Sequence, residues 1–290
     1  MRKIILSLIL TTFLLIPALS AHAEVKLGVL AHRGELKAKD KWTIFSQYLG
    51  EQLGEDVTLV PLAIAKNLEA AGNKEVDFIL TNPVLSAAIH ENYKTKLLAT
   101  LNKKAGSQFG GVIIASKKSG VTTAEGLKGK KLLTFKIGAS AGAYVFQTYH
   151  MKEKGIDVHK DFSFFKEGKK QDDIALAVKS GAIDGGFIRT GILEALEKAG
   201  KIKIDDITII DRANDDFPLI HSTKLYPEWV LMALNHVDEA KAEKVKAIAL
   251  GMTPDLPASQ KAGIKGFVEP LSLAELTAVL KDLKIPPFDK

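Results

Sequence analysis

The sequence contains no cysteine. A disulfide framework, a thiol nucleophile and a thiolate metal site are therefore excluded. Aromatic residues make up only 7% of the chain and are not interleaved with runs of basic residues, so the pattern of a nucleic-acid-binding protein is absent. The formal net charge of +6 is a modest excess among many acidic residues. Such a balance is compatible with a small anionic ligand.

The sequence motifs of common enzymes are missing as well. There is no HExxH pair and no Gly-rich phosphate loop. His150 and His159 do not match the spacing of a metal site, and no histidine–carboxylate couple is evident for Ser140. We therefore expect no enzymatic activity, no cofactor and no bound metal. An enzyme on the same fold is the least favoured alternative.

Long apolar runs are confined to the N-terminus. A short basic region, residues 1–3, precedes an apolar stretch at residues 4–19, and Ser20-Ala21-His22-Ala23 supplies the small residues that a signal peptidase reads. This layout predicts a secretory signal peptide, residues 1–23, cut after Ala23. A retained membrane anchor fits less well because the apolar stretch is short. We expect a soluble exported protein.

Residues 24–290 are too many for one small core and fit two lobes of ordinary size. Apolar segments that read as buried strands alternate with helical patterns. The strands are expected at 25–31, 57–61 and 76–80, and the helices at 41–53, 64–72 and 83–93. This alternation predicts an α/β protein with parallel strands and crossover helices.

Two segments share one design, which suggests that the lobes are built alike. VDFIL is followed by the polar pair Thr81-Asn82, and IDGGFI is followed by Arg189-Thr190. The similarity is weak and does not amount to a sequence repeat.

The turn at residues 136–142, which we call the serine turn, lies between a predicted strand at 131–135 and a predicted helix at 143–154. Ser140 is therefore expected at or near the N-cap of that helix. Ala141 and Gly142 are small, so a ligand can approach the backbone closely. A helix start carries about half a positive charge and free N–H donors, which favour an anion. The alternative is that Ser140 only caps its helix.

Polar residues follow several predicted strands, and ligands of open α/β sheets bind beyond the carboxyl ends of strands. Arg189 can hold an oxyanion through two parallel hydrogen bonds, and neutral hydroxyls and amides can complete the shell. No carboxylate was identified among these strand ends. The predicted ligand-binding residues are His32, Arg33, Thr81, Asn82, Ser140, Ala141, Gly142, Arg189, Thr190, His221 and Ser222. Together they predict a site for a small, multiply oxygenated anion.

Several of these residues have a structural alternative. His32 could be a surface-loop histidine, His221 a core histidine, and Asn82 the cap of the next helix. Arg189 could pair with Asp184 or Glu194. Tyr226 and Trp229 are assigned to packing.

Seven segments carry a resemblance to a known family. They are LGVLAHRG (27–34), VDFILTNP (76–83), FGGVIIAS (109–116), the Ser140–Gly142 turn, IDGGFIRTGILEAL (183–196), HSTKLYPEW (221–229) and KIPPF (284–288). With them the chain resembles the phosphate/phosphite/phosphonate-binding branch of periplasmic substrate-binding proteins, the PhnD-like group. Within that group, AHRG, RTGILE and HST-YPEW are similar to the sensor domains of tetrathionate-type histidine kinases.

The resemblance implies a type II periplasmic-binding-protein fold, in which two α/β lobes enclose a ligand cleft at a hinge. Lobe 1 is expected to comprise residues 24–110 and 216–290, and lobe 2 residues 111–215, with hinge segments near 109–111 and 216–221. It also implies a periplasmic location. Ser140, Arg189 and the Thr81-Asn82 loop are then expected to face the cleft.

The serine turn departs from the transporter members, in which Ser-Thr-Ser-Gly is usual. Here Ala139-Ser140-Ala141-Gly142 lacks two hydroxyls, which argues against phosphonate itself. We expect a monomeric, non-enzymatic binding protein that captures a small oxyanion for an ABC permease. The alternative is a sensor protein that signals occupancy to a separate histidine kinase in the inner membrane. Phosphate, phosphonate, a sulfur oxyanion and an organic acid all remain open as ligands.

Overall fold

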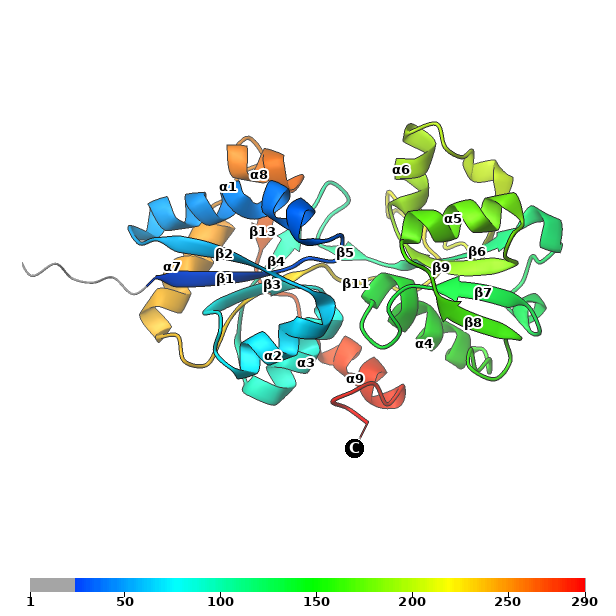
Figure 1. Cartoon of the computed structure of the whole chain (residues 1–290), viewed down its shortest axis with the longest axis horizontal. Coiled ribbons are helices and arrows are strands. Elements are labelled where there is room, and N and C mark those ends of the chain that lie inside the picture. Colours follow the sequence, from blue (N-terminus) through cyan, green and yellow to red (C-terminus); the bar gives the residue numbers. More distant parts are fainter. Residues whose placement is uncertain (1–23, 290) are drawn as a thin grey trace, which may run out of the picture.

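Two α/β lobes lie side by side and are joined by a narrow crossing region (Figure 1). The computed structural model describes residues 24–289, so the predicted signal peptide lies outside the described residues. Within this range, no helix has both the length and the apolar character needed to span a membrane. The predicted α/β class and two-lobe architecture are confirmed.

Lobe 1 is built on a six-stranded sheet in the order β13-β4-β12-β3-β1-β2. Strand β1 runs parallel to β2 and β3, whereas β12 runs antiparallel to both β3 and β4. The carboxyl ends of β1, β3 and β4 therefore meet the amino end of β12 at one edge. The strands are β1 (Val25–Leu30), β2 (Val57–Leu62), β3 (Phe78–Thr81), β4 (Lys96–Asn102), β12 (Val230–Ala233) and β13 (Gly266–Val268).

Helices cover both faces of this sheet, which explains why every residue of β3 is buried and all but Thr81 are apolar. Trp42 and Phe45 of the first helix lie in the core on one face, and Ala87 and Leu276 lie in the core on the other. The first face carries α1 (Glu35–Leu53), α7 (Glu239–Leu250) and α8 (Pro257–Ala262), and the second carries α2 (Asn67–Gly72), α3 (Pro83–Tyr93) and α9 (Ala274–Asp282).

Lobe 2 is built on a five-stranded sheet in the order β10-β6-β9-β7-β8. Strand β9 lies between parallel β7 and antiparallel β6, just as β3 lies between parallel β1 and antiparallel β12. The two segments with similar sequence thus occupy equivalent places. The elements are β6 (Gly111–Ser116), β7 (Lys131–Thr134), β8 (Phe164–Glu167), β9 (Gly185–Arg189), β10 (Ile207–Ile210), α4 (Phe146–Glu153), α5 (Gln171–Ser180) and α6 (Ile192–Lys198).

A two-stranded antiparallel ribbon carries the chain between the lobes, formed by β5 (Gln108–Phe109) and β11 (Tyr226–Pro227) (Figure 1). The segment at 216–221, where the sequence placed the second hinge, leads into contacts with lobe 2. Ser222 Oγ donates to the Ile210 carbonyl and accepts from the Ile113 N–H. The chain returns to lobe 1 only at β11.

The buried amide of Gln147 holds the end of the serine turn against the lobe 2 sheet. Its side chain has no exposed surface, and its Nε2 donates to the carbonyls of Gly142 and Ile188, both at 2.8 Å. The turn is followed by a single π-helical turn, Ala141–Val145 (η4), which leads into α4. A tether of this kind fixes the serine turn relative to the end of β9.

We predict that Gln147→Met lowers the free energy of unfolding by about 2 kcal/mol, because buried carbonyls lose their donor. Urea denaturation measures the change. Gln52→Met, at an exposed position of α1, is the matched control and should be nearly neutral. Equal stability of the two variants would contradict the tether.

Candidate functional site

Among the cavities in the cleft between the lobes, two adjoin each other and contain most of the predicted residues. The smaller, of about 40 Å³, lies at the serine turn, and the larger, of about 520 Å³, opens beside it. His32, Arg189 and Trp229 line both. Of the predicted residues, the smaller cavity brings together His32, Asn82, Ser140, Ala141, Gly142 and Arg189, and the larger adds Arg33 and Thr190.

Ser140 occupies the N-cap position of the π-helical turn, as predicted, but its side chain does not cap it. Its side chain makes no capping hydrogen bond, whereas its carbonyl accepts from the N–H of Val145, five residues later. The hydroxyl is therefore left free at the wall of the smaller cavity. Gly142 is required here for space: a Cβ would lie 2.7 Å from the Phe109 ring and 2.9 Å from the Gly110 carbonyl. The crossing segment thus packs directly on the serine turn.

Asn82 combines the capping role with a contact between the lobes. Its Oδ1 accepts from the N–H groups of Val84 and Leu85 at the start of α3. Its Nδ2 donates across the cleft to the carbonyl of Ala139, at 3.3 Å. Thr81, by contrast, is fully buried in β3 and does not line either cavity.

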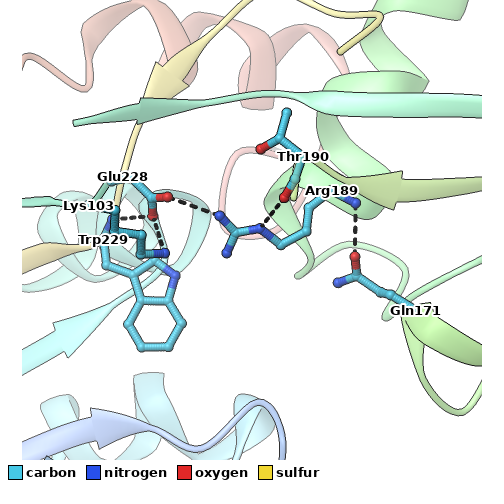
Figure 2. Close-up of polar contacts among 6 residues, drawn as sticks. All are labelled: Lys103, Gln171, Arg189, Thr190, Glu228 and Trp229. Atoms are coloured by element: carbon cyan, nitrogen blue, oxygen red, sulfur yellow. Dashed lines mark hydrogen bonds and ion pairs between the residues drawn. The ribbon is translucent and has the colours of Figure 1, made fainter. Parts of the chain in front are cut away.

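Arg189, at the end of β9, is paired with a carboxylate that the sequence analysis did not identify. Figure 2 shows its guanidinium donating to Glu228, with Nη2 and Oε1 2.9 Å apart. Its Nε donates to the Thr190 carbonyl, and the guanidinium carbon lies 4.5 Å from the centre of the Phe109 ring. The two carboxylates that the sequence offered as partners, Asp184 and Glu194, bind other groups. Asp184 accepts a hydrogen bond from a backbone N–H of β7, and Glu194 accepts one from the backbone N–H of Ile220.

Glu228 lies between two cations and is 3% exposed. Its second oxygen accepts from Lys103 Nζ at 2.9 Å, so each carboxylate oxygen faces one positive group (Figure 2). Burial by itself would raise the pKa of Glu228, but Lys103 and Arg189 outweigh it and hold the pKa below its usual value. The carboxylate is therefore ionised at neutral pH.

The cleft nevertheless keeps an excess of positive charge. Burial and the neighbouring Arg189 lower the pKa of Lys103 to about 7, despite its bond to Glu228. Burial and Arg189 also lower the pKa of Lys41. For His32, burial and then Arg189 lower the pKa to about 3, so this ring is neutral. One buried carboxylate does not balance these groups, and a bound anion would relieve their mutual repulsion.

The remaining predicted residues lie at the margins of the cleft or away from it. Arg33 forms an exposed ion pair with Asp172 of α5, at 3.4 Å, which links the lobes. His221 is buried, with one ring nitrogen at the Thr223 carbonyl and the other at Asp215, as expected of a core histidine. Neither His221 nor Ser222 lines the two cavities. The hydroxyl of Thr190 is buried without a partner among the described residues.

The sequence analysis missed Lys41, Lys103 and Glu228, and it assigned Trp229 to packing alone. Lys103 follows β4, which is parallel to β1 and β3, so the strand-end argument applied to β4 would have found it. Glu228 and Trp229 precede β12, which is antiparallel to β3. They reach the same edge from the amino end of a strand, a case that a search of carboxyl ends does not cover.

The donors of the cleft suit an anion and not a metal ion, because its unbalanced side chains are cationic or neutral. Among residues 24–289, no group of three or more histidine, aspartate or glutamate side chains is arranged to hold a metal.

Two α/β lobes around a positively charged cleft define the class of two-lobe ligand-binding proteins. The chain belongs to the family described as ABC transporter, phosphonate, periplasmic substrate-binding protein, which matches residues 27–273. This confirms the predicted family. Its members are described as binding proteins and not as enzymes.

One curated relative is the tetrathionate sensor histidine kinase TtrS of Salmonella typhimurium (strain LT2). The two are 29% identical over 269 residues, which is 90% of this chain and 44% of the relative. The chain thus spans less than half the length of that protein.

Solved structures share the fold. PhnD1 from Prochlorococcus marinus (MIT 9301), in complex with methylphosphonate, matches with a TM-score of 0.72 and 16% identity, covering 90% of this chain and 98% of its own. XAC2383 from Xanthomonas citri, bound to ATP, matches with a TM-score of 0.73 and 15% identity, and it also covers 90% of this chain and 98% of its own.

We predict that Glu228→Gln binds a sulfonate anion about tenfold tighter, ~1.4 kcal/mol, because the carboxylate no longer competes for Arg189. The same change should destabilise the ligand-free protein by about 3 kcal/mol, since two buried cations lose their counter-charge. Calorimetric titration and urea denaturation measure the two effects. Glu51→Gln, at an exposed position of α1, is the control. Weaker binding by Glu228→Gln would show that the carboxylate positions the cations instead of competing.

We also predict that anion affinity falls as the pH rises through neutrality. In the free protein the pKa of Lys103 is about 7, and a bound anion raises it, so binding takes up a proton above that pH. Glu228 stays ionised and His32 stays neutral in this range. The loss attributable to Lys103 should reach about tenfold between about pH 6 and about pH 8. Titration with methanesulfonate, which does not titrate in this range, tests it, and Lys103→Met should abolish this component.

Proposed function

We propose that this protein captures a small oxyanion in the cleft between its lobes, without catalysis, and presents it to an ABC permease. The observation that carries the proposal is the excess positive charge at Arg189, Lys41 and Lys103, which Glu228 alone does not balance. The family to which the chain belongs supports it.

The proposed ligand contacts both lobes. Ser140, the backbone of Ala141 and Gly142, and Arg189 come from lobe 2, and His32 and Asn82 come from lobe 1. An anion that bridges the two favours the closed arrangement, because only that arrangement supplies all its partners. Arg189 already has Glu228 as a counter-charge, so the ligand shares or displaces that carboxylate.

Export through the signal peptide at residues 1–23, a periplasmic location and a monomeric state belong to the same proposal. The family description is that of a periplasmic protein.

A second candidate is ligand sensing, in which the occupied cleft is recognised by a histidine kinase. The similarity to a tetrathionate sensor histidine kinase over 90% of this chain favours it. It extends the ligand class from phosphonates to sulfur oxyanions, for which two missing hydroxyls at the serine turn are no obstacle. Genes for a permease and ATPase beside this one would favour transport, and genes for a kinase and response regulator would favour sensing.

The proposal predicts that oxyanions raise the melting temperature of the protein and that Arg189→Ala abolishes this effect. A ligand at about 100 times its dissociation constant adds roughly 2.7 kcal/mol to the free energy of unfolding. A thermal-shift screen should cover phosphate, phosphonates, sulfonates, tetrathionate and organic acids. Arg212→Ala, at an exposed position of lobe 2, removes the same charge and should keep the shift.

Unchanged binding by Arg189→Ala would refute the site, and turnover of a bound compound would favour the enzyme alternative. Circular dichroism of the unliganded variant separates lost binding from lost folding.

A further inference from the structure

The larger cavity has cations of its own, apart from those at the serine turn. Lys41 and Lys103 line it and do not line the smaller cavity. Lys103 Nζ lies 5.8 Å from the centre of the Trp229 ring, and Lys41 Nζ lies 5.1 Å from that of Trp42. The two indoles stack with their centres 6.4 Å apart. Two ammonium groups therefore stand beside one aromatic wall.

These two lysines are less well neutralised than Arg33 and Lys261, which also line the larger cavity, and they are less exposed than Lys37, a further cation there. Arg33 pairs with Asp172, and Lys261 pairs with Asp40. Within residues 24–289, Lys41 has no carboxylate at ion-pair distance, and Lys103 shares its only carboxylate with Arg189. The lowered pKa values of both lysines reflect the same imbalance.

The two cavities adjoin, and the residues that line both are uncharged except for Arg189. Leu30, His32 and Trp229 line both, together with Arg189. His32 meets Trp229 edge to face, with ring centres 5.2 Å apart, and burial keeps the histidine neutral through its lowered pKa. A ligand passing here meets apolar surface on one side and the guanidinium on the other.

The cavity volumes also exceed the needs of a single compact oxyanion. The larger cavity has more than ten times the volume of the one at the serine turn. A phosphate or sulfate bound at the serine turn would leave Lys41 without a counter-charge and Lys103 with only the carboxylate of Glu228, which is costly for partly buried cations.

We propose that Lys41 and Lys103, beside Trp229, form a second anion subsite, so that the ligand is an elongated dianion with an oxyanion group at each end and a less polar middle. This rests on the proposed function and names its substrate class. One end lies at the serine turn with Arg189, and the other lies in the larger cavity.

The test compares anions with one and two charged ends by calorimetric titration near pH 6, where Lys103 is protonated. Methanesulfonate is paired with 1,2-ethanedisulfonate and 1,4-butanedisulfonate, and methylphosphonate with methylenediphosphonate. Wild-type protein should bind at least one two-ended anion tenfold or more tightly than its one-ended partner. Lys41→Met should remove that advantage, because it should weaken two-ended binding about tenfold more than one-ended binding. Lys39→Met removes the same charge from an exposed position on the same helix and should retain the advantage.

Three results would overturn the subsite. If one-ended and two-ended anions bind wild-type protein equally well, the second subsite is refuted, but the proposed function is not. If Lys41→Met weakens the binding of both kinds of anion by the same factor, Lys41 contributes only to the overall electrostatic potential of the cleft, and there is no second subsite. Finally, an absence of binding for every anion in both pairs and in the thermal-shift screen would remove the proposed function along with the subsite.

Discussion

The ion pairs of Glu228 with Arg189 and Lys103 are the interaction on which the site depends. Glu228 directly follows the crossing strand β11, Lys103 follows β4 of lobe 1, and Arg189 ends β9 of lobe 2. One buried carboxylate thus connects both sheets at the point where they meet. Removing one partner of such a buried pair costs about 3–5 kcal/mol, far more than an exposed ion pair contributes. The arrangement is stable, yet it leaves the cleft positive.

Other contacts between the lobes across the cleft are weak by comparison. The Arg33–Asp172 pair is exposed, and pairs of that kind contribute about 0–1 kcal/mol. The amide of Asn82 adds a single long hydrogen bond to lobe 2. Away from these polar groups the lobes also share a buried apolar cluster, to which Tyr144 and Val145 of lobe 2 and Val84 and Ala88 of lobe 1 belong. A bridging anion would add to these contacts in the closed arrangement, because the polar contacts across the cleft are few and weak.

Much of the architecture could be predicted from the sequence, because buried parallel strands and their crossover helices leave local patterns. VKLGVL apart from Lys26, and FILT apart from Thr81, are apolar since helices cover both faces of their sheet, and Asn82-Pro83 marks a helix start that the structure shows in full. The strand-end argument predicts that Ser140 and Arg189 share one site, and both line the smaller cavity. It did not separate them from His221, whose side chain is satisfied within lobe 2.

By itself the sequence determined the α/β class, the resemblance to periplasmic binding proteins and the strand ends that carry Ser140 and Arg189. Only the tertiary structure decided which carboxylate faces Arg189, because Glu228 lies 39 positions away along the chain. It also decided that Lys41 and Lys103 share one cavity, since a helix and a strand end meet there. Local patterns record burial and capping, whereas the pairing of charges depends on strand direction and on how two lobes meet, which no short segment encodes.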